Sequence, residues 1–150
     1  MRLMIQFASA LPQTRLTKDA LVRATGLPES FVAKILQSLT RAGLVVSKRG
    51  VDGGFLLGVD ARTVSIVDII QAIDGPIALN VCLTGTNGCE QQAWCGAHRL
   101  WARAQAEMLK VLRSQSLAEL AAETVRNKRA VETKMHECRE EAELEEARNV

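Results

Sequence analysis

Apolar residues recur at largely helical intervals through the first part of the chain, which predicts a series of short helices. The first helix extends towards Pro12, and its apolar positions are Leu3, Ile5, Phe7, Ala8 and Leu11. Thr17 is a suitable N-cap for a second helix over residues 18–25, which Gly26 ends in a tight turn. We expect the inward face of this second helix to consist of Ala20, Leu21 and Ala24.

A third amphipathic helix is predicted from Pro28 to Ala42, because proline suits a first helical turn and Gly43 follows the last one. Its buried face is expected to be Phe31, Val32, Ile35, Leu36 and Leu39. Its polar face carries Ser30, Lys34, Gln37 and Arg41. Two short helices joined by the brief turn at Gly26 are typical of a helix-turn-helix, whose second helix enters a DNA major groove.

Two short apolar runs, at 44–47 and 55–57, predict strands joined by a glycine-rich loop. Three glycines and an aspartate in this loop allow positive φ values, so it can form a tight hairpin. Lys48 and Arg49 lie at the start of the loop, where they suit contacts with phosphates or a minor groove. The alternative is an ordinary solvated hairpin. With the preceding helices, the hairpin predicts a winged helix-turn-helix DNA-binding domain over residues 1–76.

Ser65, with Asp68 three residues later, predicts the capped start of a further helix. The buried face of this helix is expected to be Ile66, Ile69, Ile70 and Ile73. Residues 77–98 contain three cysteines, and up to Cys95 they show no clear period, which indicates a loop. The fold class expected is therefore mainly α, with a small β-hairpin wing and a long helix after the loop.

The long helix is predicted from about Cys95 and carries an apolar stripe. The stripe consists of Trp101, Ala104, Met108, Val111 and Leu112. Because so small a domain offers little to cover it, we expect residues 95–123 to form a homodimer, helix against helix. The alternative is a stripe that folds back on its own domain. Residues 124–150 are dominated by charge, which predicts a flexible, partly helical tail where His136 and Cys138 are simply exposed.

Basic and acidic residues are distributed unevenly along the chain. Residues 1–60 contain eight Lys or Arg against four Asp or Glu, whereas residues 61–150 contain eleven against thirteen. A basic first part joined to an acidic second part indicates nucleic acid on one side only. Aromatic residues make up 3% of the chain, so a base-stacking surface for single strands is not expected. No apolar run approaches the roughly 18 residues needed to cross a bilayer, so a transmembrane protein is not expected. We also expect a cytoplasmic protein without a membrane partner.

Three cysteines and a histidine have the residue types and the spacing of a metal site. Cys82, Cys89, Cys95 and His98 fall within seventeen positions. His98 follows Cys95 by about one helical turn, so both side chains can face one ion or cluster. The four suit Zn²⁺ as Cys₃His, or an iron–sulfur cluster in which an imidazole replaces a thiolate. Structural zinc sites use tighter cysteine pairs, so the wide intervals favour a larger inorganic core. Three unrelated core cysteines are the alternative.

Enzymatic chemistry finds no support in the sequence. There is no nucleophile paired with a base, no phosphate-cradling loop and no pair of acids in a cleft-like setting. The glycine-rich stretch at 50–58 lacks the GxxxxGK[ST] pattern, and a strand follows it. We therefore expect neither an enzyme nor a small-molecule substrate. A cluster carrier without DNA binding is a further alternative, but the helix pair and the basic wing disfavour it.

The segment GLPESFVAKILQSLTRAGLVVSKRGVDGGFLLGVDARTVSIVDIIQAIDG, followed by the three cysteines, resembles the iron–sulfur winged-helix regulators that include IscR, NsrR and RirA. The resemblance covers about residues 1–121. Its specific features are the wing pattern Arg49-Gly50-x-x-Gly53-Gly54-Phe55-x-Leu57 and the cysteine triplet before a long helix. The family consists of dimeric bacterial transcription regulators, mostly repressors, which sense iron, cluster supply, nitric oxide or redox state.

The resemblance implies a role for each candidate residue. Cys82, Cys89 and Cys95 match thiolate ligands, and His98 matches the imidazole that completes a 2Fe-2S cluster; a 4Fe-4S cluster is the alternative. It also implies a roughly palindromic double-stranded operator. The residues expected to contact it are Ser30, Lys34, Gln37, Arg41, Lys48 and Arg49. A rival of the same fold holds zinc or no metal and acts as a thiol redox switch. The family usually starts upstream of Met1, where some nitric-oxide sensors carry an acidic ligand for the partner subunit, so a misassigned start is an equal expectation.

Overall fold

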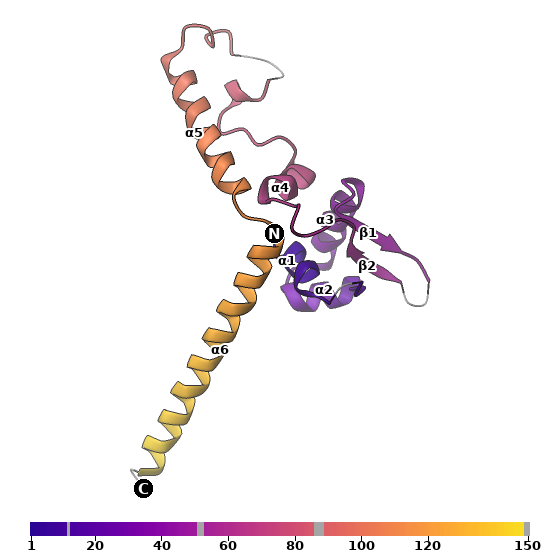
Figure 1. Cartoon of the computed structure of the whole chain (residues 1–150), viewed down its shortest axis with the longest axis vertical. Coiled ribbons are helices and arrows are strands. Elements are labelled where there is room, and N and C mark those ends of the chain that lie inside the picture. Colours follow the sequence, from indigo (N-terminus) through magenta and orange to yellow (C-terminus); the bar gives the residue numbers. More distant parts are fainter. Residues whose placement is uncertain (12, 51–52, 86–88, 149–150) are drawn as a thin grey trace.

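The computed structural model describes residues 1–11, 13–50, 53–85 and 89–148, with side chains as far as residue 139. Six helices, one short 3-10 turn and a two-stranded hairpin occur in these ranges (Figure 1). In chain order they are α1 Arg2–Ser9, α2 Lys18–Thr25, α3 Glu29–Arg41, β1 Val45–Lys48, β2 Gly54–Leu57, α4 Ile66–Asp74, η1 Val81–Leu83, α5 Gly96–Arg113 and α6 Leu117–Arg148. The mainly helical winged architecture that the sequence predicts is confirmed.

The first three helices form around the signals that the sequence predicts. The backbone N–H of Ala20 donates to the Thr17 hydroxyl (3.1 Å) and starts α2, while Gly26 ends it in the left-handed region at φ 66°. These helices contribute most of a core whose members include Leu3, Met4, Phe7, Leu21, Val32, Leu36 and Leu39. The three helices therefore pack as one unit.

Several expected inward positions of these helices are wrong. Pro12 lies outside the described residues; α1 already ends at Ser9, and Leu11 is 80% exposed. In α2, Ala24 is exposed and its neighbour Thr25 is buried, because the Thr25 hydroxyl donates to the backbone oxygen of Leu21 (2.7 Å) and needs no water. In α3, Phe31 is 51% exposed instead of buried.

The hairpin is antiparallel and pairs Val45 with Leu57 and Lys48 with Gly54. It is fastened to the segment before α2, because Leu16 and Phe55 exchange backbone hydrogen bonds of 2.8 and 2.9 Å. At its base, a Cβ on Gly58 would lie 2.6 Å from the backbone oxygen of Gly43, so only glycine allows the chain to pass so close to the end of α3. The base of the wing is thus packed directly against the end of α3.

Helices α4 and α6 begin side by side, and each begins with the same device. The Ser65 hydroxyl and the Asp68 carboxylate form the predicted capping box of α4. Ser116 and Glu119 form an equivalent pair at the start of α6. The two serines face each other across an isolated antiparallel bridge. On α4, Val67 and Ile69 are buried, whereas Ile66, Ile70 and Ile73 are only half-buried, so the predicted isoleucine face is wrong in part.

The chain after residue 124, expected to be a flexible tail, is helical in the structure. Helix α6 runs without interruption from Leu117 to Arg148, across the expected boundary between the dimerisation region and the tail. No glycine or proline occurs after Gly96, and alanine, glutamate, lysine and arginine are strong helix formers, so intrinsic propensity explains the helix. Its described residues beyond Val125 are all exposed, which agrees with the expected solvation.

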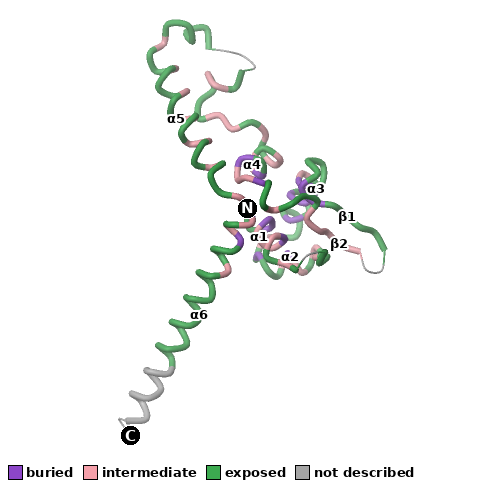
Figure 2. The backbone as a smooth tube through the Cα atoms, viewed as in Figure 1, coloured by how far each residue is buried: buried purple, intermediate pink, exposed green. Residues whose placement is uncertain are grey.

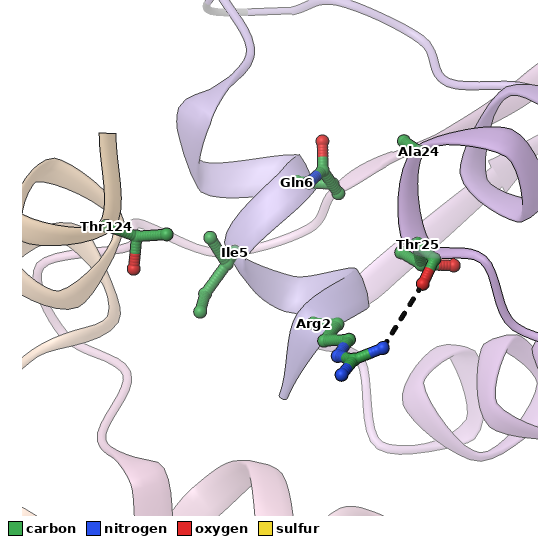
Figure 3. Close-up of a pocket in the computed structure, with 6 residues that line it drawn as sticks. All are labelled: Arg2, Ile5, Gln6, Ala24, Thr25 and Thr124. Carbon is green, nitrogen blue, oxygen red and sulfur yellow. Dashed lines mark hydrogen bonds between the residues drawn. The ribbon is translucent and has the colours of Figure 1, made fainter. Parts of the chain in front are cut away.

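The first turns of α6 belong to the winged part, although the rest of the helix leaves it (Figure 1). Leu117 and Ala121 are buried, and α6 packs along α1. A shallow cavity of about 280 Å³ lies where α1, α2 and α6 meet (Figure 3). There the guanidinium of Arg2 donates to the backbone oxygen of Thr25 (3.4 Å), satisfying a carbonyl at the end of α2. This contact ties the α2 end to α1.

Candidate metal pocket and nucleic-acid interface

The cysteine loop is built from three short pieces of local structure. Cys82 lies in η1, and Cys95 is the N-cap residue of α5. Between Cys89 and Cys95 the chain makes a compact turn, in which the Gln92 and Cys95 backbone N–H groups donate to Cys89 and Gln91 (both 2.8 Å). His98 follows in the first turn of α5. The loop therefore returns the cysteines to the start of the long helix.

All four predicted ligand residues line one cavity of about 300 Å³ at this point. The complete lining is Asn80, Val81, Cys82, Cys89, Gln92, Cys95, Ala97, His98 and Trp101. Cys82 and Cys95 are half-buried and Cys89 is exposed, all three as free thiols. Among the described residues, no three His, Cys, Asp or Glu side chains are close enough together to hold a single metal ion. The structure thus brings the four residues to one pocket, in an open arrangement.

One ring nitrogen of His98 has the surroundings expected of a metal ligand. Its Nδ1 is buried and has no hydrogen-bond partner in the described chain, which is costly for a polar atom. Its Nε2 lies 3.3 Å from the side-chain nitrogen of Gln92. If the amide turns over, its oxygen accepts from Nε2–H, and Nδ1 keeps a lone pair for a metal. Sequence reasoning missed Gln92, because only the turn at 89–95 brings it to His98.

The second candidate surface is basic and lies on α3 and the wing. Ser30, Lys34, Gln37 and Arg41 are all exposed on α3, as expected. Lys48 ends β1, and Arg49 follows it; both are exposed. Within the described ranges, none of the four basic residues Lys34, Arg41, Lys48 and Arg49 forms an ion pair. Figure 1 shows the hairpin projecting away from α5 and α6, so these charges are open to a large partner.

Glu29 is the acidic residue nearest the start of α3, and it is already neutralised. Its carboxylate pairs with Lys18 of α2 at 2.5 Å. The hydrogen bond from Lys18, assisted by its charge, holds the pKa of Glu29 below its ordinary value of 4.5. The pair joins the first turns of α2 and α3 and leaves the exposed face of α3 with a net positive charge.

The predicted dimerisation stripe is only partly covered in the single chain. None of the residues of α5 is buried. Trp101 is 40% exposed and Val111 68% exposed; Ala104 is also exposed, whereas Met108 and Leu112 are half-buried. Helix α5 contacts α4 and η1, and Figure 2 shows most of its residues as exposed, with half-buried positions between them. The stripe is therefore only partly covered by its own chain: Trp101, Ala104 and Val111 are exposed, whereas Met108 and Leu112 are half-buried.

Comparison with known proteins identifies the family to which this chain belongs. Residues 1–123 match the Rrf2 family, described as iron-dependent transcriptional regulators. The chain belongs to the Rrf2 family. The resemblance stated from the sequence is therefore confirmed, and the relatives of this Rrf2 protein are transcription regulators rather than enzymes. No helix in the described part of the chain is long and apolar enough to cross a membrane.

Individual relatives of this Rrf2 protein include IscR of Vibrio vulnificus, 35% identical over 95 residues, or 63% of this chain and 56% of that protein. The chain thus spans a little over half of the IscR sequences that it matches. An HTH-type transcriptional regulator of Mycobacterium tuberculosis is 35% identical over 121 residues, covering 80% of this chain and 74% of that protein.

Solved structures of similar fold include CymR, the global cysteine regulator of B. subtilis, with TM-score 0.66 and 28% identity over 81% of this chain and 88% of CymR. IscR of T. potens has TM-score 0.66 and 22% identity over 82% of this chain and 80% of that one, a likeness that shows the fold alone.

Proposed function

We propose that this Rrf2-family chain is a homodimeric, cytoplasmic DNA-binding repressor whose DNA affinity depends on an iron–sulfur cluster. The observation that carries the proposal is the cavity lined by Cys82, Cys89, Cys95 and His98, with Nδ1 of His98 buried and unpartnered. Three thiols and an imidazole are a ligand set for an iron–sulfur cluster. Their open arrangement suits a core larger than one ion.

Each residue of the pocket has a distinct part in this proposal. The thiolates of Cys82, Cys89 and Cys95 would bind iron, and His98 would complete a 2Fe-2S cluster; with another fourth ligand, a 4Fe-4S cluster is the alternative. Gln92 would orient the imidazole through Nε2. When bound, the cluster supplies a centre that responds to iron supply, oxidants or nitric oxide. Cys89 is exposed, so assembly and loss can proceed from solvent.

The position of the pocket provides a route by which the presence or loss of a cluster would change DNA binding. The pocket lies at the start of α5, and α5 also contacts α4 of the winged part. The backbone N–H of Leu79 donates to the side-chain oxygen of Gln105 (3.0 Å), which ties the loop to the middle of α5. Ordering the loop around a ligand would fix the angle between α5 and the winged part. Only a difference in cluster affinity between two such angles can shift their populations.

A dimer through α5 would present two copies of α3 to one duplex. The stripe of Trp101, Ala104, Met108, Val111 and Leu112 would form the interface. The two α3 helices would enter successive major grooves about 34 Å apart on a roughly palindromic operator. Lys34, Arg41, Lys48 and Arg49 would neutralise phosphates, so affinity should fall steeply with salt. Arg49→Ala should weaken operator binding and leave the metal content unchanged.

The cluster is tested on protein purified without oxygen, by iron and acid-labile sulfide analysis and by visible and Mössbauer spectra. We expect cluster absorption in the wild type and its loss in Cys89→Ala. The matched control is Cys138→Ala, because both thiols are exposed but Cys138 lies on α6 outside the pocket. This control should keep the cluster. A colourless wild-type protein that holds zinc or no metal would overturn the proposal.

A second candidate, a thiol redox switch on the same fold, is favoured by one observation. A solved structure of Staphylococcus aureus CymR in an oxidized form is similar to this chain (TM-score 0.61, 27% identity), and the cysteines of the chain are free and, among the described residues, not gathered around a single ion. In this reading hydrogen peroxide takes two electrons and two protons from two thiols, which form a disulfide as peroxide becomes two waters. Mass spectrometry of peroxide-treated, metal-free protein tests it. Two cysteines of the pocket joined in a reversible disulfide that alters DNA binding would support this candidate.

A further inference from the structure

Phe31 is the member of the expected apolar face of α3 that the structure leaves in solvent. It is 51% exposed, whereas Val32, Ile35, Leu36 and Leu39 are exposed by 8% or less. A single exposed apolar side chain is ordinary on a protein surface and proves nothing alone. Its position on α3 and the side chains near it indicate what this ring could contact.

The ring lies in the first turn of the helix, at its third residue. In a helix-turn-helix, the residues at the N-terminal end of the second helix are those that contact base edges. Phe31 directly follows Ser30 and precedes Lys34 by three positions, and all three side chains are exposed. Residues three apart lie side by side on a helix. The ring is thus the apolar member of a group that is otherwise polar and basic.

The charges around the ring favour DNA as the partner that covers it. Lys34 and Arg41 are exposed on the same helix and form no ion pair with any described residue. Glu29, the acidic residue of this turn, is engaged by Lys18 of α2. A phosphate backbone is complementary to this surface, whereas a second copy would place like charges together.

We infer that Phe31 contacts the C5-methyl group of a thymine, and so requires that base at one position of each operator half-site. The inference rests on the proposed DNA binding. Of the groups on base edges in the major groove, the thymine methyl is the apolar one, and a phenylalanine ring suits it. Ser30 and Lys34 can donate hydrogen bonds to several acceptors, but neither distinguishes a methyl group from a hydrogen. The ring therefore adds selectivity where the polar side chains add affinity.

The test uses the full chain, purified without oxygen. Duplexes are first selected from a random library by the wild-type protein, and each enriched thymine is then replaced by deoxyuridine, which removes the methyl group alone. We expect one symmetric position at which this replacement lowers wild-type affinity about fourfold, the value of one buried methyl-sized group. Phe31→Ala should bind the thymine and deoxyuridine duplexes equally.

Two control variants separate this effect from others. Lys34→Ala should weaken binding to every duplex and lower the salt slope by about one, while it keeps the preference for thymine. Leu11→Ala removes an apolar side chain that is still more exposed and lies off α3, and it should change nothing. Circular dichroism confirms that each variant is folded.

Failure of the inference differs from failure of the proposed function. If the wild type selects no duplex, the proposed DNA binding fails, and the inference with it. If the wild type binds a defined operator but tolerates deoxyuridine at every thymine, the role of Phe31 alone is overturned. It is also overturned if Phe31→Ala changes the sedimentation of free protein, since the ring would then contact protein.

Discussion

The winged part and the α5–α6 arm differ in what holds them in place. The core is made by α1–α4, the hairpin and the first turns of α6, whereas α5 buries none of its residues and the side chains of α6 described beyond Val125, as far as residue 139, are exposed (Figure 2). The winged part can therefore be stable through its own apolar contacts. The arm has few such contacts, so we propose that its arrangement is set by a second copy along α5 and by a ligand in the cysteine pocket.

The largest expected effect comes from the core. Leu39 is fully buried between α3 and its neighbours, so Leu39→Ala should lower the free energy of unfolding by about 2–5 kcal/mol through lost contacts and a cavity. Val131→Ala on the exposed part of α6 is the control and should change it by no more than about 0.5 kcal/mol. Urea denaturation followed by circular dichroism measures both. Equal losses would remove the distinction between the two parts.

For the α5–α6 arm, we expect substitutions to affect homodimer formation rather than the free energy of unfolding. Trp101→Ala on α5 should weaken the homodimer about 30-fold, as loss of a central aromatic contact of about 2 kcal/mol would. Trp94→Ala is the matched control, since Trp94 is 73% exposed but precedes α5, and this variant should sediment as the wild type does. Sedimentation equilibrium decides. An unchanged dimer in Trp101→Ala would mean that the stripe has another role.

Three serines at helix ends test where the stable winged part ends and the α5–α6 arm begins. Ser65→Ala and Ser116→Ala each remove a helix cap joined to the core, so each should lower the free energy of unfolding by about 1 kcal/mol. Ser114, at the end of α5, merely donates to the Val111 carbonyl, and Ser114→Ala should have an effect below about 0.5 kcal/mol. A large effect of Ser114→Ala would shift the boundary into α5.

The smallest effect is a dependence on pH. Hydrogen bonds from the Ser116 backbone and hydroxyl lower the pKa of Glu119 below its ordinary 4.5. A carboxyl with a lowered pKa stabilises the folded state above that ordinary value, and the contribution is lost as pH falls through the folded pKa. Glu119→Gln keeps the cap without titrating. Its stability should therefore fall less than that of the wild type below pH 4.5; parallel curves would contradict this.

The sequence predicts best where the signal is local. Thr17, Gly26 and the Ser65–Asp68 pair act through one helical turn, and the structure has all of them. Burial of single positions depends on which element packs against which face, so Phe31 and Ala24 were misplaced. Helix α6 is longer than the sequence pattern predicts. Its exposed part has no apolar period, and the helix propensity of its residues is sufficient to form it.

The pocket was predictable in its residue types but not in its detail. The cysteine spacing indicates a shared site, and the fold does bring Cys82, Cys89, Cys95 and His98 to one cavity. The contact between Gln92 and His98 depends on how the turn at 89–95 folds, which has no sequence period to reveal it. Trp101 lines the same cavity and belongs to the α5 stripe, so it links the pocket to the proposed dimer.

The most direct test compares DNA affinity of one preparation before and after its cluster is removed with a chelator under anaerobic conditions. Fluorescence anisotropy on a selected operator gives both dissociation constants, and sedimentation verifies that the cluster-free protein is still a dimer. We expect the cluster-loaded dimer to bind at least about tenfold more tightly, a coupling of about 1.4 kcal/mol. Equal affinities would contradict it, because the pocket would then not control the DNA-binding surface.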